Sequence, residues 1–126
     1  MLKRLLRGFT LVELMVVMAI IALLLSLALP RYFKHLETSR ETILKQDLAV
    51  MRDAIDKYHG DTGRYPDGLD ELVSARYLRA LPVDPITERA DTWQIVAPSG
   101  TAAGEMYDIK SGAPGTAHDG TAYADW

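Results

Sequence analysis

The sequence contains no cysteine among its 126 residues. A disulfide therefore cannot stabilise the chain, whatever the redox compartment. The length suits one small domain, and a soluble part of about a hundred residues or fewer buries only about 60–65% of its unfolded surface. We expect such a domain to need further stabilisation, from a bound metal or from packing in an assembly.

Basic residues are scarce over most of the chain. The formal net charge is −3, although Lys3, Arg4 and Arg7 all precede Phe9. The remainder carries 11 basic against 17 acidic residues and has no basic stripe. Because phosphate binding needs clustered Lys and Arg, the composition argues against nucleic acid as a partner.

The sequence also lacks the patterns of common catalytic sites. It has three histidines, no Gly-x-Ser-x-Gly elbow and no phosphate-binding glycine loop. His35 and His59 are far apart in the chain and have no companion motif. We therefore predict that the protein is not an enzyme.

One long apolar run dominates what is present. Residues 9–29 span about 30 Å as a helix, which is the thickness of a bilayer core. The polar interruptions are Thr10, Glu13 and Ser26. Residues 1–8 form a short basic leader whose small residue, Gly8, precedes the run, whereas an ordinary secretory signal is cleaved after it. Cleavage at Gly8 would leave a single-pass anchor on the mature protein, and we expect its N-terminus to be inside.

Glu13 is the only charged residue in this run. A carboxylate inside a membrane costs roughly 2.5–3.5 kcal/mol, so it needs a partner or a path to water. It could snorkel to the surface, be a tolerated accident or serve a function, and we favour a function. After cleavage at Gly8, the new amine of Phe9 in one copy could pair with Glu13 of a neighbour. Such a heterologous contact propagates as a helical polymer.

The helical pattern continues beyond the apolar run. Pro30 removes one backbone hydrogen bond, so we expect a kink or local loosening there. Residues 30–59 form an amphipathic continuation with one apolar face. Its members are Phe33, Leu36, Ile43, Leu44, Leu48, Met51, Ile55 and Tyr58. We predict that the helix runs from Phe9 to His59, before a left-handed Gly60. At about 75 Å it is too long for so small a domain, so its first half must be buried in lipid or in other copies.

Residues 60–126 carry signals of short elements that would cover this face. Turn residues dominate 60–66, and Asp67 is placed to cap a short helix over 69–73. The prolines of 77–85 exclude regular helix and predict an extended, packed loop. The side chains expected to pack on the long helix are Tyr65, Tyr77, Leu78 and Leu81.

Two stretches with β-propensity follow. Residues 92–96 and 106–109 predict an antiparallel pair, with Trp93 and Tyr107 also covering the helix. Residues 111–126 are expected to be loop. The predicted fold class is α+β, a ladle in which a long N-terminal transmembrane and amphipathic helix packs on a small antiparallel sheet.

These features resemble the type IV pilin superfamily. The basic leader with Gly8, Phe9, Glu13 and Pro30 matches the prepilin pattern over about thirty residues. The downstream chain resembles, more specifically, the major pseudopilins of type II secretion systems. The features that carry this likeness are the turn at 60–66, Tyr77-Leu78, Leu81-Pro82, Asp84-Pro85 and Trp126.

The resemblance implies a filament subunit. Prepilin peptidase would cleave between Gly8 and Phe9, Phe9 would be N-methylated, and Glu13 and Pro30 would serve assembly. It implies a bacterial inner-membrane protein with a periplasmic C-terminal domain. Its homopolymer, a pseudopilus, would work with minor pseudopilins and an inner-membrane assembly platform to drive folded proteins across the outer membrane. The alternatives are a type IV or competence pilin and a monomeric membrane-anchored domain that binds a partner.

The Gly- and Asp-rich tail raises a calcium hypothesis. Calcium accepts six to eight oxygen ligands, and Asp119 and Asp125 could supply carboxylates beside backbone carbonyls. The resemblance implies a structural calcium in this region, although this tail is short and contains few acidic residues. The alternative is an uncoordinated, flexible tail. His118 lacks the spaced companion that a transition-metal site needs.

The processing hypothesis predicts the first residue of the mature protein. Protein extracted from membranes is expected to begin at Phe9 and to carry one methyl group on its terminal nitrogen, because cleavage after Gly8 exposes that amine. N-terminal sequencing and intact mass measurement check both points. Recovery of an unmodified Met1 would contradict the hypothesis.

Overall fold

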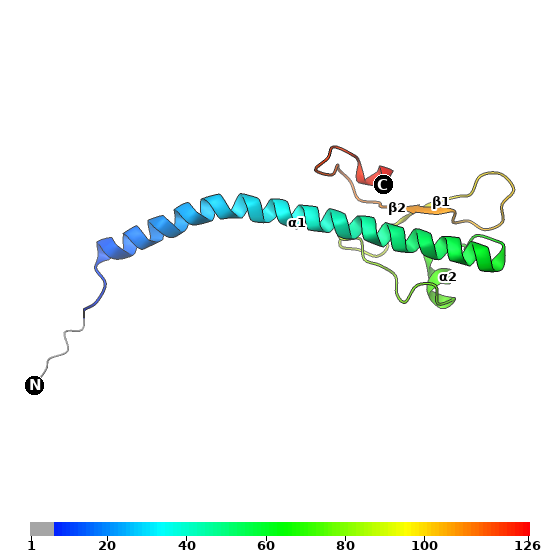
Figure 1. Cartoon of the computed structure of the whole chain (residues 1–126), viewed down its shortest axis with the longest axis horizontal. Helices are drawn as coiled ribbons and strands as arrows, with labels where there is room; N and C mark the ends of the chain where they lie inside the picture. Colours follow the sequence, from blue (N-terminus) through cyan, green and yellow to red (C-terminus); the bar gives the residue numbers. More distant parts are fainter. Residues whose placement is uncertain (1–6) are drawn as a thin grey trace, which may run out of the picture. The chain divides into compact units, whose positions relative to one another are not determined.

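The computed structural model describes residues 7–126 (Figure 1). Its elements are helices α1 (Leu11–Thr62) and α2 (Leu69–Ser74), strands β1 (Gln94–Val96) and β2 (Asp108–Lys110), and a 3-10 helix η1 (Tyr123–Asp125). The predicted α+β class is confirmed. Most of the predicted leader, including Lys3 and Arg4, lies outside the described residues. The chain divides into two compact units, one ending at Glu37 and the other spanning Thr38–Trp126.

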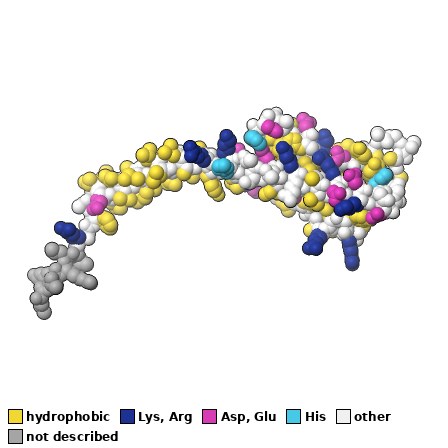
Figure 2. Space-filling model, in the orientation of Figure 1, with side chains coloured by type: hydrophobic (Ala, Val, Ile, Leu, Met, Phe, Trp, Pro, Cys, Tyr) yellow, Lys and Arg dark blue, Asp and Glu magenta, His cyan; other side chains and the backbone are white. Residues whose placement is uncertain are grey.

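The first unit consists mainly of the apolar part of α1. Its most apolar window of 18 residues has a mean hydropathy of 2.7, and none of that window is buried within the chain. Figure 2 shows the apolar side chains that cover this part of the helix. By length and composition, α1 can cross a membrane. The helical conformation continues through Pro30, which cannot supply the N–H for one hydrogen bond of the helix.

The C-terminal end of α1 lies three residues beyond the predicted one. The helix was predicted to stop at His59, yet it continues to Thr62. Gly60 remains helical, and the left-handed residue is Gly63, with a φ of 76°. The N–H of Gly63 donates to the carbonyl of His59 at 2.9 Å, which satisfies one of the last free carbonyls of the helix.

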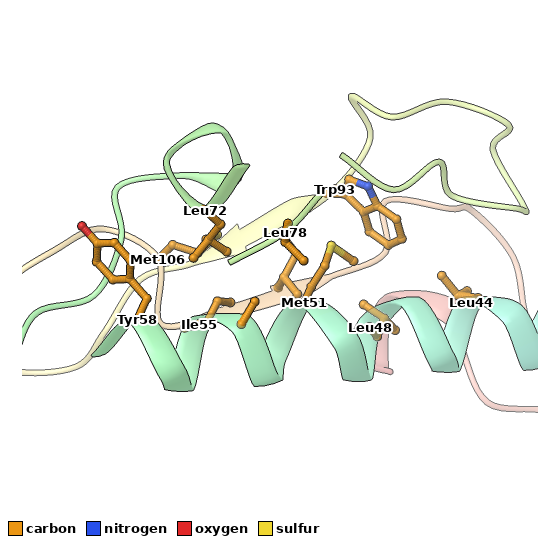
Figure 3. Close-up of a cluster of buried hydrophobic side chains, with 11 residues drawn as sticks. Leu44, Leu48, Met51, Ile55, Tyr58, Leu72, Leu78, Trp93 and Met106 are labelled. Carbon is orange, nitrogen blue, oxygen red and sulfur yellow. The ribbon is translucent and has the colours of Figure 1, made fainter. Parts of the chain in front are cut away.

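The second unit has one hydrophobic core, which is built on one face of α1 (Figure 3). Residues of α1 at intervals of three and four face α2, the proline-containing loop and the strands. The helix contributes Leu44, Leu48, Met51, Ala54, Ile55 and Tyr58. The rest of the chain contributes Leu72, Leu78, Trp93, Met106 and Ile109. Tyr65 and Tyr77 pack at its edge, as predicted.

Three residues predicted for this face are exposed. Phe33 and Leu36 belong to the first unit and are 56% and 38% exposed. Ile43 is 48% exposed because it precedes the buried Leu44, and successive side chains of a helix diverge by about 100°. The buried apolar face therefore begins at Leu44, about three turns after Phe33, where the pattern placed its start.

Asp67 does not cap α2, contrary to the prediction. Gly68 occupies the N-cap position and makes no side-chain hydrogen bond there. Glu71 in the first turn instead accepts the N–H of Asp67 at 2.7 Å, together with the hydroxyl of Tyr58. The carboxylate of Asp67 lies 3.6 Å from the guanidinium of Arg64, so an ion pair takes it away from the helix end.

The sheet has two antiparallel strands, with Ile95 of β1 opposite Ile109 of β2. Strand β2 starts two residues later than predicted. Met106 takes the core position before the strand, and Tyr107, which was predicted to cover the helix, is 53% exposed. The ring of Tyr107 packs edge-to-face on Tyr65, with 5.4 Å between centroids.

The loop before β2 docks on the turn that follows α1. The N–H of Tyr65 donates to Ala103, and the N–H of Met106 donates to Pro66, each at 2.9 Å. Gly104 has a φ of 99°, and a Cβ there would lie 2.0 Å from the carbonyl oxygen of Tyr65. The close approach of the two backbones therefore requires glycine at this position.

The core position of Leu44 predicts a large effect of its truncation. Leu44→Ala is expected to lower the free energy of unfolding by about 2–5 kcal/mol, because the side chain is fully buried. Ile43→Ala, next to it on the exposed face, is expected to cost less than about 1 kcal/mol. Denaturant titration of the full chain in detergent measures both. Equal losses in the two variants would show that the core is placed wrongly.

Candidate functional site

The residues predicted for cleavage lie beside Glu13, one of the two residues predicted for assembly, at the start of α1. Arg7, Gly8, Phe9 and Thr10 precede the helix, and together with Glu13 of its first turn they line one open hollow. Phe9 is 84% exposed. The structure thus places the predicted cleavage site and the predicted assembly charge side by side, in a segment that is open to approach.

Thr10 caps the helix, which explains why α1 begins at Leu11 and not at Phe9. The hydroxyl oxygen of Thr10 accepts the N–H of Glu13 at 3.1 Å. Thr-x-x-Glu is the sequence of a capping box, and a carboxylate in the first turn also interacts favourably with the helix dipole. The sequence reasoning missed this cap, although the Thr10–Glu13 spacing signals it.

Among residues 7–126, nothing requires a glycine at position 8. A Cβ at this position would meet no atom of these residues within 4 Å, and its φ lies outside the left-handed region that favours glycine. Neither packing nor backbone conformation explains the small residue. Pro30, the other predicted assembly residue, lies well inside α1 and is exposed.

The two carboxylates of the calcium hypothesis are differently placed. Asp119 accepts the N–H and the hydroxyl of Thr121, at 3.0 and 2.6 Å, and these hydrogen bonds lower the pKa of Asp119. Asp125 is an exposed residue of η1. Within residues 7–126, no three His, Cys, Asp or Glu side chains gather closely enough to hold a metal. The side chains do not fit a carboxylate-rich calcium site, and calcium binding stays a prediction.

A contact that the sequence reasoning missed connects the tail to α1. Glu41 is 4% exposed, and its carboxylate accepts the main-chain N–H of His118 at 2.9 Å and the hydroxyl of Tyr123 at 3.1 Å. The ring of His118 also contacts it through Nδ1. Residues 111–126 are accordingly more ordered than the predicted loop, with a bridge between Thr116 and Ala122 and the helix η1.

Comparison with known proteins defines the class. Residues 4–29 match the family described as "Prokaryotic N-terminal methylation motif". This motif, the exposed apolar start of α1 and the small α+β unit are the features of a type IV pilin-like protein. No solved structure matches the chain.

The curated relatives narrow the class. The chain is 32% identical to the type II secretion system core protein G of Klebsiella michiganensis, over 90% of this chain and 89% of that protein. It is 33% identical to the protein of the same name in Escherichia coli (strain K12), over 86% and 81%. A fimbrial protein, EcpC of Eikenella corrodens, is 29% identical over 96% of this chain and 82% of its own length. The chain belongs to the type II secretion system core protein G family.

The cap at Thr10 predicts a local effect on the first turn. Thr10→Ala is expected to weaken that turn by about 1 kcal/mol, because it leaves the N–H of Glu13 without its acceptor. Hydrogen exchange of the full chain in detergent measures this as faster exchange at residues 11–14. Ser26→Ala is the matched control, because the Ser26 hydroxyl donates to a carbonyl within the helix and caps nothing. Equal exchange in both variants would rule out the cap.

Proposed function

We propose that this chain is the structural subunit that polymerises into the pseudopilus of a type II secretion system, which drives folded proteins across the outer membrane. The observation that carries the proposal is the membership of the core protein G family over most of the chain. In this role the protein supplies surfaces for assembly and no reaction of its own.

The exposure of the first unit supports polymerisation. Large apolar side chains along residues 9–29 have no cover within the chain. A contiguous apolar surface of this size is unstable in water, so lipid or other copies must bury it. In a membrane-anchored subunit, lipid would bury this surface. After the subunit enters a helical bundle, other copies would bury it.

The charge at Glu13 supports a defined order within the bundle. Within residues 7–126 its carboxylate makes no salt bridge or side-chain hydrogen bond. In a membrane or a bundle, such a charge is costly without a partner. Cleavage after Gly8 would create a cationic amine at Phe9, and that amine in a neighbouring copy is a suitable partner for Glu13.

The same proposal assigns location and partners. Prepilin peptidase would recognise Gly8, and the open surroundings of this glycine support recognition by an external protein. The protein would lie in the bacterial inner membrane, with residues 38–126 in the periplasm. Minor pseudopilins and an inner-membrane assembly platform would start and extend the filament.

A second candidate function is a type IV pilin. The similarity to the fimbrial protein EcpC over nearly the whole chain favours it. The two functions differ in the phenotype of a deletion strain. Loss of secreted folded proteins supports the pseudopilus, whereas loss of surface fimbriae with normal secretion supports the pilin.

The assembly role of Glu13 predicts the behaviour of its variants. Glu13→Ala is expected to be cleaved at Gly8 but to reduce filament yield at least about tenfold, because the amine of the neighbour loses its partner. Cross-linking in membranes, read as a ladder of multimers, measures assembly. Glu37→Ala, an exposed acid on the same helix, is the control and should assemble normally. Filaments of Glu13→Ala at wild-type yield would refute the pairing, and a wild-type protein without a ladder would indicate a monomer.

A further inference from the structure

Glu41 is a buried charge on α1, about one turn before the buried Leu44 of the core. The residues next to it, Thr42 and Ile43, are exposed, whereas Glu41 lies under the C-terminal tail. Burying a carboxylate is costly unless its oxygens are hydrogen-bonded. Here one oxygen accepts the N–H of His118 and the hydroxyl of Tyr123, and the other contacts the ring of His118.

The hydrogen bonds keep Glu41 ionised. Burial raises the pKa of its carboxyl, but the main-chain and ring contacts of His118 and the hydroxyl of Tyr123 outweigh burial and lower the pKa. Hydrogen bonds to a charged group are stronger than those between neutral groups. The contact with the tail is therefore a charge-assisted one.

Two further residues of α1 hold the end of the same segment. The guanidinium of Arg52 donates to the main-chain oxygen of Trp126 at 2.7 Å, and it also binds Asp108 at 2.8 Å. The ammonium of Lys45 lies 4.4 Å from the centroid of the Trp126 ring, in a cation–π contact. The indole N–H of Trp126 donates to the hydroxyl of Thr121 at 2.7 Å, which closes the tail on itself.

Glu41, Lys45 and Arg52 share one face of the helix. They are separated by four and seven residues, which are close to one and two turns. The tail lies beside this part of α1 (Figure 1). Along this face, Glu41 binds a main-chain N–H of the tail, Lys45 contacts an aromatic ring, and Arg52 binds a main-chain oxygen.

We propose that Glu41, Lys45 and Arg52 form a docking site for residues 116–126, so that this chain holds its tail without a structural calcium ion. The side chains named for calcium do not compete with this role, because Asp119 is engaged by Thr121 and Asp125 is an exposed residue of η1. A consequence is that folding of the second unit, and any assembly that follows, is independent of calcium. The proposal does not rest on the proposed function.

Hydrogen exchange of residues 113–126 in the full chain, extracted in detergent, tests the proposal. In the wild type, a calcium chelator or added calcium chloride is expected to change exchange less than about twofold. Glu41→Ala is expected to speed exchange at His118 at least about tenfold, because three hydrogen-bond partners of one carboxylate are lost. Glu37→Ala is the matched control and should exchange as the wild type does.

Two results would overturn the proposal. One is tail exchange that rises about tenfold with chelator and is restored by calcium, because a metal then holds the tail. The other is unchanged tail exchange in Glu41→Ala. If Glu41→Ala loses protection throughout residues 44–58, the whole core has been destabilised and tail exchange in this variant is uninformative. Tail exchange in the isosteric Glu41→Gln, and in the wild type with chelator, then tests the proposal. The measurement needs no filaments, so its failure is distinguishable from failure of the proposed function.

Discussion

The uncovered apolar surface at the start of α1 is the constraint on which the rest of the molecule depends. None of the most apolar window is buried within the chain, so its burial has to come from lipid or from other copies. This requirement bears on Glu13 as well, because a carboxylate in an apolar span needs a partner or a path to water. The start of the helix also constrains this charge. Thr10 fixes where the first turn begins, and therefore on which face of α1 the carboxylate of Glu13 lies.

The same helix also provides the framework of the second unit. Residues 44, 48, 51, 55 and 58 form the buried face, and side chains of α2 and β2 pack on it, with Tyr123 of η1 at its edge. Because the chain has no cysteine, this face and the polar contacts around it must hold short elements that are too small to be stable alone. The network of Tyr58, Arg64 and Glu71 illustrates this, since it connects the end of α1 to the start of α2 and also binds the main-chain N–H of Asp67.

The sequence predicted the features that depend on local periodicity. The long helix, its buried face from Leu44 onward and the antiparallel pair follow from spacings of three, four and two residues. The errors arose where a choice between neighbours depended on packing, as at Gly60 and Gly63, or at Met106 and Tyr107. For the candidate site, Gly8, Phe9 and Glu13 could be named from the motif, and the Thr10 cap had a readable signal. The contact of Glu41 with His118 had none, because 77 residues separate the partners.

The position of Glu41 connects the tail to the stability of the whole second unit. In a small unit without disulfides, a Gly-rich end is ordered only if its contacts exceed the entropy cost of fixing it. Glu41, Lys45 and Arg52 supply contacts of three kinds, and they do so from the rigid helix and not from another loop. Arg52 also binds Asp108 and the carbonyl of Ile109 in β2, so one guanidinium ties the tail to the sheet. Order in the tail therefore depends on α1. The same helix supplies one buried face to the core of the second unit and an apolar N-terminal part that is exposed.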